Sequence, residues 1–99
     1  MVKVSELPNF DAAEFLENED DYVAFLNEAL EEGDPAEIRH ALNVIARARG
    51  MTTVAKEARV PRESLYRALS DKGNPEFGTI MSVIKALGIS LSAHQVKHA

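Results

Sequence analysis

Apolar residues recur at helical spacing along most of the 99-residue chain, and capping residues divide this pattern into successive helices. Residues 1–9 are expected to be extended, because Pro8 disfavours a helix there. A short helix is predicted to follow, with Asp11 as its N-cap and with Phe10 and Phe15 at the two positions of a hydrophobic staple.

Two longer helices are predicted next, each with a start signal and a stop signal. The first lies between Asn18, its N-cap, and Gly33, its C-cap. The second begins at Pro35, directly after the N-cap Asp34, and ends before Gly50. Their inward positions are Tyr22, Leu26, Ala29 and Leu30 in the first helix, and Ile38, Leu42 and Ile45 in the second.

Residues 52–69 are predicted to form two short helices joined by a tight turn. The first helix starts at a threonine cap, Thr52 or Thr53, and the second starts at Pro61 and reaches about Ser70. The apolar positions that would form their common seam are Ala55, Val60, Leu65 and Leu69.

A last helix is predicted from about Pro75 to Leu87, after a run of turn-forming residues and before Gly88. Its inward positions are Ile80, Val83, Ile84 and Leu87. Residues 89–96 partly alternate apolar and polar side chains, which makes them a candidate strand. Because a single strand is not stable alone, it would pair with a second copy of the chain or with the N-terminal segment.

The second short helix is predicted to present an outward side that is suited to DNA. Helical spacing places on this side Arg62, Glu63, Ser64, Tyr66 and Arg67. Arginine can bind guanine through two hydrogen bonds, and serine and tyrosine can contact phosphates or base edges. Two short helices that cross at the small Ala55 are typical of a helix-turn-helix, whose second helix lies in the major groove. The alternative is an ordinary helical hairpin with solvated charges.

Further residues around these two helices are suited to DNA phosphates. Thr52 and Thr53 lie at a helix N-terminus, where backbone amides attract anions, and Lys72 follows the second helix. Arg59 stands in the turn at a position that favours glycine, because the backbone there is often left-handed. A residue with a side chain costs about 1 kcal/mol in that conformation. Contact with a phosphate would offset this cost.

Charge divides the chain into two unlike parts. Residues 1–37 contain twelve acidic residues and one lysine, whereas residues 38–99 contain ten basic and four acidic residues, which together give the net charge of −5. The basic part suits a polyanion such as DNA, and the acidic part suits a basic protein. The simpler interpretation of the acidic part is a solvated helix face.

The N-terminal aromatic residues allow two interpretations. They pack on the core of the helix-turn-helix, or they form an apolar stripe, rimmed with acidic residues, that binds a basic protein, and some of them are expected to do each. Two or three of them are expected to close the core. The candidate anchors for such a partner are Phe15, Tyr22, Phe25 and Leu26.

Other classes of function find little support in the sequence. The chain has no cysteine, so disulfides and thiolate metal sites are excluded, and its histidines (His40, His94 and His98) lack metal-ligand spacing. No nucleophile motif or phosphate-binding loop is present. No apolar run is long enough for a membrane span, and no signal-like segment precedes a cleavage site. We expect a soluble, cytoplasmic protein that is not an enzyme and needs no metal or cofactor.

The segment LYRALSDKGNPEFGTIMSVIKALGISLS closely resembles a family of bacterial addiction-module antidote proteins, the antitoxins paired with RelE/ParE-type toxins. The matching motifs are RESLYRALS, GNP, ALG and LS, and the acidic opening FDAAEFL with DDYVAFLNEALEEGDP is similar to the family's N-terminal half. The resemblance spans about residues 10–92. The family more often has Ser and Gly around the recognition turn, where this chain has Arg59 and Pro61. The resemblance implies a lambda-repressor-like helical domain, neutralisation of a toxin and repression of the protein's own operon.

Together, the patterns and the resemblance predict an all-α, lambda-repressor-like helix-turn-helix bundle of five to six helices. Its parts, all in one globular unit, are an extended segment at 1–9, acidic helices at 10–33, a helix-turn-helix domain at 34–88 and a tail at 89–99. We expect a homodimeric antitoxin whose partners are a basic toxin and operator DNA. The alternatives are a transcriptional regulator without a toxin partner, and an interaction module that no longer binds DNA.

Overall fold

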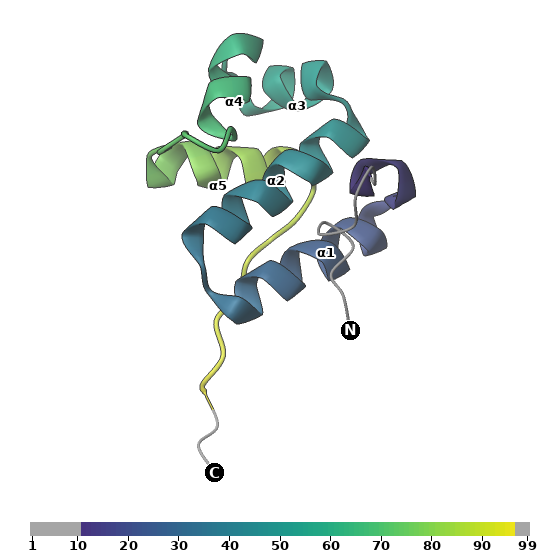
Figure 1. Ribbon diagram of the computed structural model, residues 1–99, viewed down its shortest axis with the longest axis vertical. Helices are drawn as coiled ribbons and strands as arrows, with labels where there is room; N and C mark the ends of the chain where they lie inside the picture. The colour runs from purple at the N-terminus through teal and green to yellow at the C-terminus, as the bar shows by residue number, and fades with distance from the viewer. Residues whose placement is uncertain (1–10, 97–99) are drawn as a thin grey trace.

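Five α-helices and one 3-10 helix form the regular structure of residues 11–96, the part of the chain that this computed structural model describes (Figure 1). They are η2 (Ala12–Phe15), α1 (Glu19–Glu32), α2 (Pro35–Arg49), α3 (Met51–Ala58), α4 (Arg62–Ala68) and α5 (Phe77–Ala86). The described residues contain no strand, so this part of the protein is all-helical. The expectations for residues 1–9, for Phe10 and for His98 lie outside the described residues.

Short polar side chains start the first three helical segments, as predicted. Asp11 accepts a hydrogen bond from the Ala13 amide at 3.1 Å, and Asn18 accepts one from the Asp21 amide at 3.0 Å. Asp34 accepts one from Ala36 at 2.9 Å. Each cap satisfies an amide that lacks a partner in the first turn, which explains why these helices begin where the sequence indicates.

Gly50 corrects the predicted start of α3. The threonine cap at Thr52 or Thr53 was wrong, because α3 begins at Met51 and Gly50 itself is the N-cap, without a side-chain hydrogen bond. Gly50 has a φ of 111°, a conformation that residues with side chains rarely adopt. The chain therefore turns from α2 into α3 within one residue, and both threonines lie inside the first turn of α3.

The bounds of α4 and α5 differ from the predicted ones by one to two residues. Pro61 is the N-cap of α4 rather than its first residue, and α4 ends at Ala68 instead of about Ser70. Helix α5 begins at Phe77, with Glu76 in extended backbone before it. Helix ends fray, and shifts of one or two residues at each end are common for that reason.

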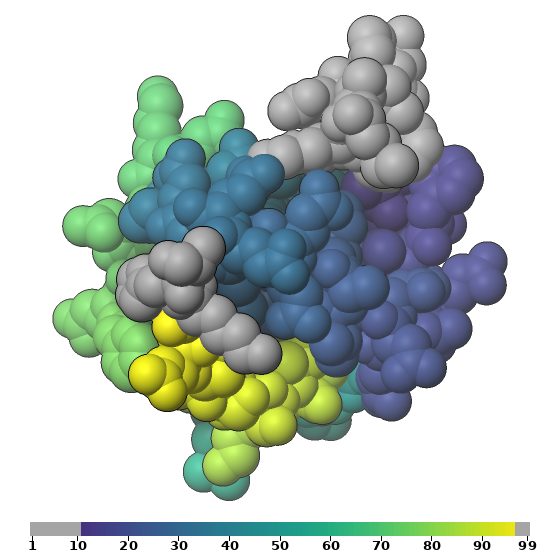
Figure 2. Space-filling model, turned by 90° about the horizontal axis from the view of Figure 1, so that it is seen from below, coloured from purple at the N-terminus to yellow at the C-terminus, as the bar shows by residue number. Residues whose placement is uncertain are grey.

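Helix α2 lies in the middle of the molecule and contacts elements on both sides. It packs against η2 and α1 on one side and against α3 on the other. Figures 1 and 2 agree on this order, with α2 between the purple N-terminal residues and the green residues that follow α4. The core contains residues from all five α-helices, and its fully buried large side chains are Leu26, Leu42, Val44, Ile45, Val54, Leu65, Val83 and Leu87.

Two arginines at the end of α2 connect it to the acidic N-terminal elements. Arg47 pairs with Asp11 at 3.1 Å, which ties the start of η2 to α2. Arg49 pairs with Glu57 of α3 at 3.4 Å and lies 3.9 Å from Glu19 at the start of α1. These pairs are partly exposed, and such pairs contribute about 0–1 kcal/mol each to stability. The apolar core therefore contributes most of the free energy that holds these elements together.

The predicted strand at residues 89–96 does not form in the single chain. These residues have no regular secondary structure, and the tail runs past α2 towards the turn between α1 and α2 (Figure 1). Gly88 ends α5 with a φ of 76°, and the Ile89 amide donates to the Ile84 carbonyl at 3.2 Å. A strand needs a second strand for its backbone hydrogen bonds, and the described residues provide none.

The longest helices, α1 and α2, have 14 and 15 residues, and several of these are charged. Neither they nor any other helix within residues 11–96 has the length and apolar composition needed to cross a bilayer.

Candidate nucleic-acid interface

A tight turn joins α3 to α4 and is held by two backbone hydrogen bonds. The Val60 amide donates to the Ala55 carbonyl at 3.0 Å, and the Arg59 amide donates to the Lys56 carbonyl at 3.2 Å. This pair of bonds is a Schellman motif, which ends a helix with one left-handed residue. The left-handed residue is Arg59, with φ 60° and ψ 41°, as the sequence predicted for this position.

The seam between α3 and α4 contains the small and apolar residues that the sequence indicated. Ala55 is 4% exposed and Leu65 is fully buried, and Leu69 closes the end of α4 at 3% exposure. Val60 is half-buried and packs against the same core. A small residue at the crossing lets the two short helices approach closely, which fixes the direction of α4 relative to α3.

The outer side of α4 presents polar side chains to solvent. The exposed residues there are Arg62, Glu63, Tyr66 and Arg67. Ser64 is an exception to the predicted outward set, because it is half-buried at the edge of the seam. Ser64 directly precedes the buried Leu65, and its side chain is less exposed to solvent than the helical spacing predicted.

Arg62 and Tyr66 form a connected pair on this surface. The guanidinium Nη2 donates to the Tyr66 hydroxyl at 3.0 Å, and the guanidinium carbon lies 5.3 Å from the centre of the tyrosine ring. Residues four apart on a helix are neighbours, and a cation over an aromatic ring is attracted to it. The pair therefore orders two long side chains and leaves the other guanidinium donors available.

The residues expected to contact phosphates lie at two places beside α4. Thr52, Thr53 and Arg59 are exposed and line one hollow along α3, together with Lys56 and Glu57. Lys72 lies exposed in the turn between α4 and α5. The structure thus brings Thr52, Thr53 and Arg59 together in one hollow, and Lys72 follows the C-terminal end of α4.

The sequence interpretation missed Lys56 and Lys85, two exposed cations near this surface. Lys56 lines the same hollow as Arg59, and Lys85 of α5 lines a second hollow with Arg59 and Ser82. A signal for Lys56 was present, because it lies in α3 between the two threonines and Arg59. No local pattern indicated Lys85, since α5 meets α3 only in the folded chain.

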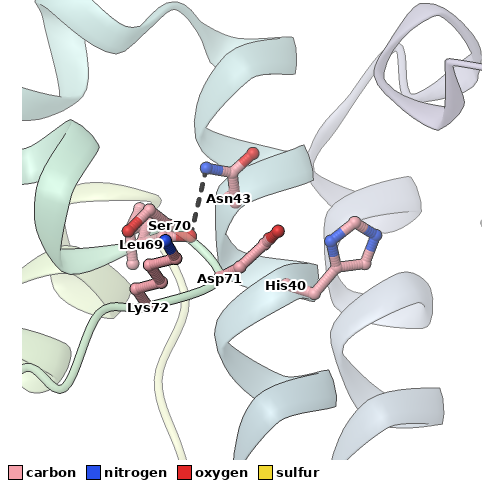
Figure 3. Close-up of a pocket in the computed structure, with 6 residues that line it drawn as sticks. All are labelled: His40, Asn43, Leu69, Ser70, Asp71 and Lys72. Atoms are coloured by element: carbon pink, nitrogen blue, oxygen red, sulfur yellow. Dashed lines mark hydrogen bonds between the residues drawn. The ribbon is translucent and has the colours of Figure 1, made fainter.

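A third hollow lies between α2 and the turn after α4 (Figure 3). Its lining residues are His40, Asn43, Leu69, Ser70, Asp71 and Lys72. Asn43 donates its amide Nδ2 to the Leu69 carbonyl at 3.3 Å, and Arg39 donates to the Asp71 carbonyl at 2.8 Å. No sequence signal indicated Arg39 or Asn43, because their partners are backbone atoms far away in the chain.

Of the four candidate toxin anchors, Tyr22 and Leu26 are core residues of the chain. Tyr22 is 6% exposed and Leu26 is 1% exposed, because both lie on the side of α1 that packs against α2. Side chains this deeply buried cannot contact a partner without unfolding α1. Phe25 is half-buried against the core, and Phe15 is 61% exposed.

The outer side of α1 has an apolar position that sequence analysis missed. Its exposed residues follow helical spacing and are Asp20, Val23, Ala24, Asn27, Glu28 and Glu31. Val23 is 41% exposed and lies among these acidic side chains. Val23 directly follows the buried Tyr22 and is not among the predicted inward positions of α1, so it lies at the edge of the buried side.

The described residues form an all-helical fold with an exposed polar helix and an acidic helix near the N-terminal end. The sequence matches the family described as probable addiction module antidote protein over residues 6–95, and the chain therefore belongs to this family. A relative from Haemophilus influenzae, described only as an uncharacterized protein, is 45% identical over 94 residues, which cover 95% of this chain and 97% of that protein. No solved structure matches the chain significantly.

Proposed function

We propose that this antidote protein neutralises a basic toxin of the RelE/ParE type and represses its own operon, and that it does so without catalysis. The observation that best supports DNA binding is the α3–α4 unit, with its small crossing residue, left-handed turn and exposed polar helix. In this proposal α3 and α4 form a lambda-repressor-like helix-turn-helix, and α4 is the recognition helix.

Helix α4 would lie in the major groove, and its outer side would contact base edges. Arg67 would bind a guanine through two hydrogen bonds, and Glu63 would accept from a cytosine amino group. Arg62 and Tyr66, already paired at 3.0 Å, would act together at the edge of the groove. The half-buried Ser64 would reach at most a phosphate.

Residues on either side of α4 would fix the position of the protein on the DNA backbone. Thr52, Thr53 and Arg59 would contact phosphates from α3, and Lys72 would do so from the opposite end of α4. Such contacts give affinity and register without selecting a sequence. A homodimer would place two recognition helices one DNA turn apart, and we include this state in the proposal.

The outer side of α1 would receive the toxin. Toxins that act on RNA or DNA need a basic surface, and the acidic side chains around Val23 are complementary to it. Val23 and Ala24 would supply apolar contact at the centre, with the half-buried Phe25 at the edge. Charge would then speed the encounter, while the apolar contact slows dissociation.

Mobility-shift assays with the DNA upstream of the gene test the DNA-binding part of this proposal. We expect Arg67→Ala to lose about 1–3 kcal/mol of binding free energy and some specificity, because it removes a base contact. Lys72→Ala should weaken binding to all DNA sequences alike and reduce the salt dependence of that binding, because it removes a phosphate contact. If Arg67→Ala binds the upstream DNA as tightly as the parent, α4 is not the recognition helix.

Co-expression with the product of the neighbouring gene tests the toxin-binding part. We expect the two proteins to co-purify and the antidote to restore growth. Growth that is not restored by any expressed level of the folded antidote would contradict the proposed neutralisation.

A further inference from the structure

Helix α4 has few means of its own to hold its direction. It contains seven residues, and its N-cap, Pro61, makes no side-chain hydrogen bond. A helix this short is not stable in isolation, so its position depends on contacts with the rest of the chain. The buried Leu65 and Leu69 supply apolar contact, which is not directional.

Directional contacts to the end of α4 come from α2. Asn43 donates to the Leu69 carbonyl at 3.3 Å, and Arg39 donates to the Asp71 carbonyl at 2.8 Å. The two donors are four residues apart and so lie on one side of α2. Figure 3 shows the Asn43 amide aimed at the chain where α4 ends. Arg39 and Asn43 are called the α2 clamp below.

The segment that the α2 clamp holds is itself tightly closed. The Ser70 hydroxyl donates to the Arg67 carbonyl at 2.8 Å, and the Gly73 amide donates to the Ser70 carbonyl at 2.9 Å. A side chain at Gly73 would collide with the carbonyl of Ala68 and would lie 2.6 Å from that of Arg67. These contacts tie the turn to the last residues of α4, so a hydrogen bond to the turn also restrains the end of the helix.

We propose that Arg39 and Asn43 are positioning residues for DNA recognition, which hold α4 at the angle its outer side needs to reach base edges. This inference rests on the proposed DNA-binding function. Neither residue needs to touch DNA. Sequence-specific hydrogen bonds depend on side-chain geometry, whereas phosphate attraction tolerates small changes in angle. Loss of the α2 clamp should therefore reduce specificity more than general affinity for DNA.

The experiment uses the full chain with Asn43→Ala, Arg39→Met and the double variant. The first readout, without DNA, is amide hydrogen exchange in α4 compared with α2. We expect exchange in α4 to become about tenfold faster in the double variant, as the loss of two hydrogen bonds implies, while α2 changes little. Because Arg39 is half-buried at most, Arg39→Met alone gives the answer if the double variant does not fold.

The second readout is the ratio of affinities for the upstream DNA and for unrelated DNA of equal length. We expect this ratio to fall about tenfold in the double variant, with an unchanged slope against salt concentration. Arg39→Lys, which keeps a donor and a positive charge, should retain most of the affinity ratio of the parent chain. Arg47→Ala is the control for the other contact of Asn43: it removes the Arg47 hydrogen bond to the Asn43 side-chain oxygen, together with the Arg47 pair to Asp11, and leaves the Leu69 contact.

Each result decides between distinct possibilities. Unchanged exchange in α4, or an unchanged affinity ratio in the double variant, overturns the positioning role. A fall in affinity for all DNA with a smaller salt slope would mean that Arg39 contacts a phosphate directly, which also overturns it. If the parent chain itself does not prefer the upstream DNA, the proposed function is wrong, and hydrogen exchange still decides whether the α2 clamp holds α4.

Discussion

Arg59 is the one residue other than glycine within residues 11–96 that has a left-handed backbone. Its amide and that of Val60 complete the hydrogen bonds that end α3, so the conformation is required by the turn. Its side chain is exposed beside Thr52 and Thr53, where a phosphate contact is proposed. Backbone strain and surface charge therefore coincide at one residue.

Replacing Arg59 with glycine should weaken DNA binding without loss of stability. The left-handed cost of about 1 kcal/mol is removed and is partly offset by the greater freedom of glycine in the unfolded chain. We expect an unchanged or slightly higher free energy of unfolding in urea, with weaker binding to all DNA sequences. A clear loss of stability would mean that the Arg59 side chain stabilises the fold.

Ala55 should tolerate no larger side chain, because it is 4% exposed at the crossing of α3 and α4. Ala55→Leu overpacks this contact, which typically costs about 1–3 kcal/mol. We expect a lower Tm by calorimetry and a loss of specific DNA binding in the same variant. Ala24→Leu, at an exposed position of α1, is the matched control and should leave the Tm nearly unchanged.

At the scale of the element, α1 has two sides with different roles. Its inner side places Tyr22 and Leu26 in the core, and its outer side presents Val23 among acidic residues. Removing residues 1–33 would therefore expose the core of α2 and destabilise the whole chain, so truncation cannot isolate the toxin surface. Substitutions on the outer side can do so.

Glu28→Lys combined with Glu31→Lys should weaken toxin association without loss of stability. Both side chains are exposed near the C-terminal end of α1, where positive charge is favourable to the helix dipole. We expect the association rate with the toxin to fall by roughly tenfold at low ionic strength, measured by stopped-flow or surface binding. The control pair Asp71→Lys and Glu76→Lys makes the same charge change away from α1. Equal effects from both pairs would mean that only net charge matters.

At the scale of the whole molecule, the surface includes apolar side chains that the single chain leaves exposed. Phe77 is 78% exposed at the start of α5, and Leu91 and Val96 of the tail are 42% and 68% exposed. The described part of the tail has unpaired backbone groups as well, which the proposed dimer would pair with those of a second copy. Ile89 differs from these residues, because it packs against the core.

A chain that ends at Ser90 should shift towards the monomer and lose affinity for operator DNA. This truncation keeps Ile89 and removes Leu91 and Val96, so the fold should remain intact by circular dichroism. Sedimentation velocity measures the expected change in mass. A full-length chain that is already monomeric at micromolar concentration would contradict the proposed dimer.

The sequence by itself determined where most helices begin and end. Asp34 and Gly33 define their helix ends through hydrogen bonds and backbone angles that involve only nearby residues. The left-handed turn at Arg59 and the burial of Ala55 and Leu65 also followed from local spacing. Local signals suffice wherever the deciding contacts lie within a few residues in the chain.

The tertiary structure alone decided how deeply the inward residues of α1 are buried and what holds α4. Tyr22 and Val23 are neighbours in the sequence, yet the position of α2 buries the first and leaves the second exposed. Arg39 and Asn43 donate to carbonyl groups 32 and 26 residues away, and backbone carbonyls leave no trace in the sequence. Such contacts exist only after the chain has brought α2 against the end of α4, so no reading of local pattern could indicate them.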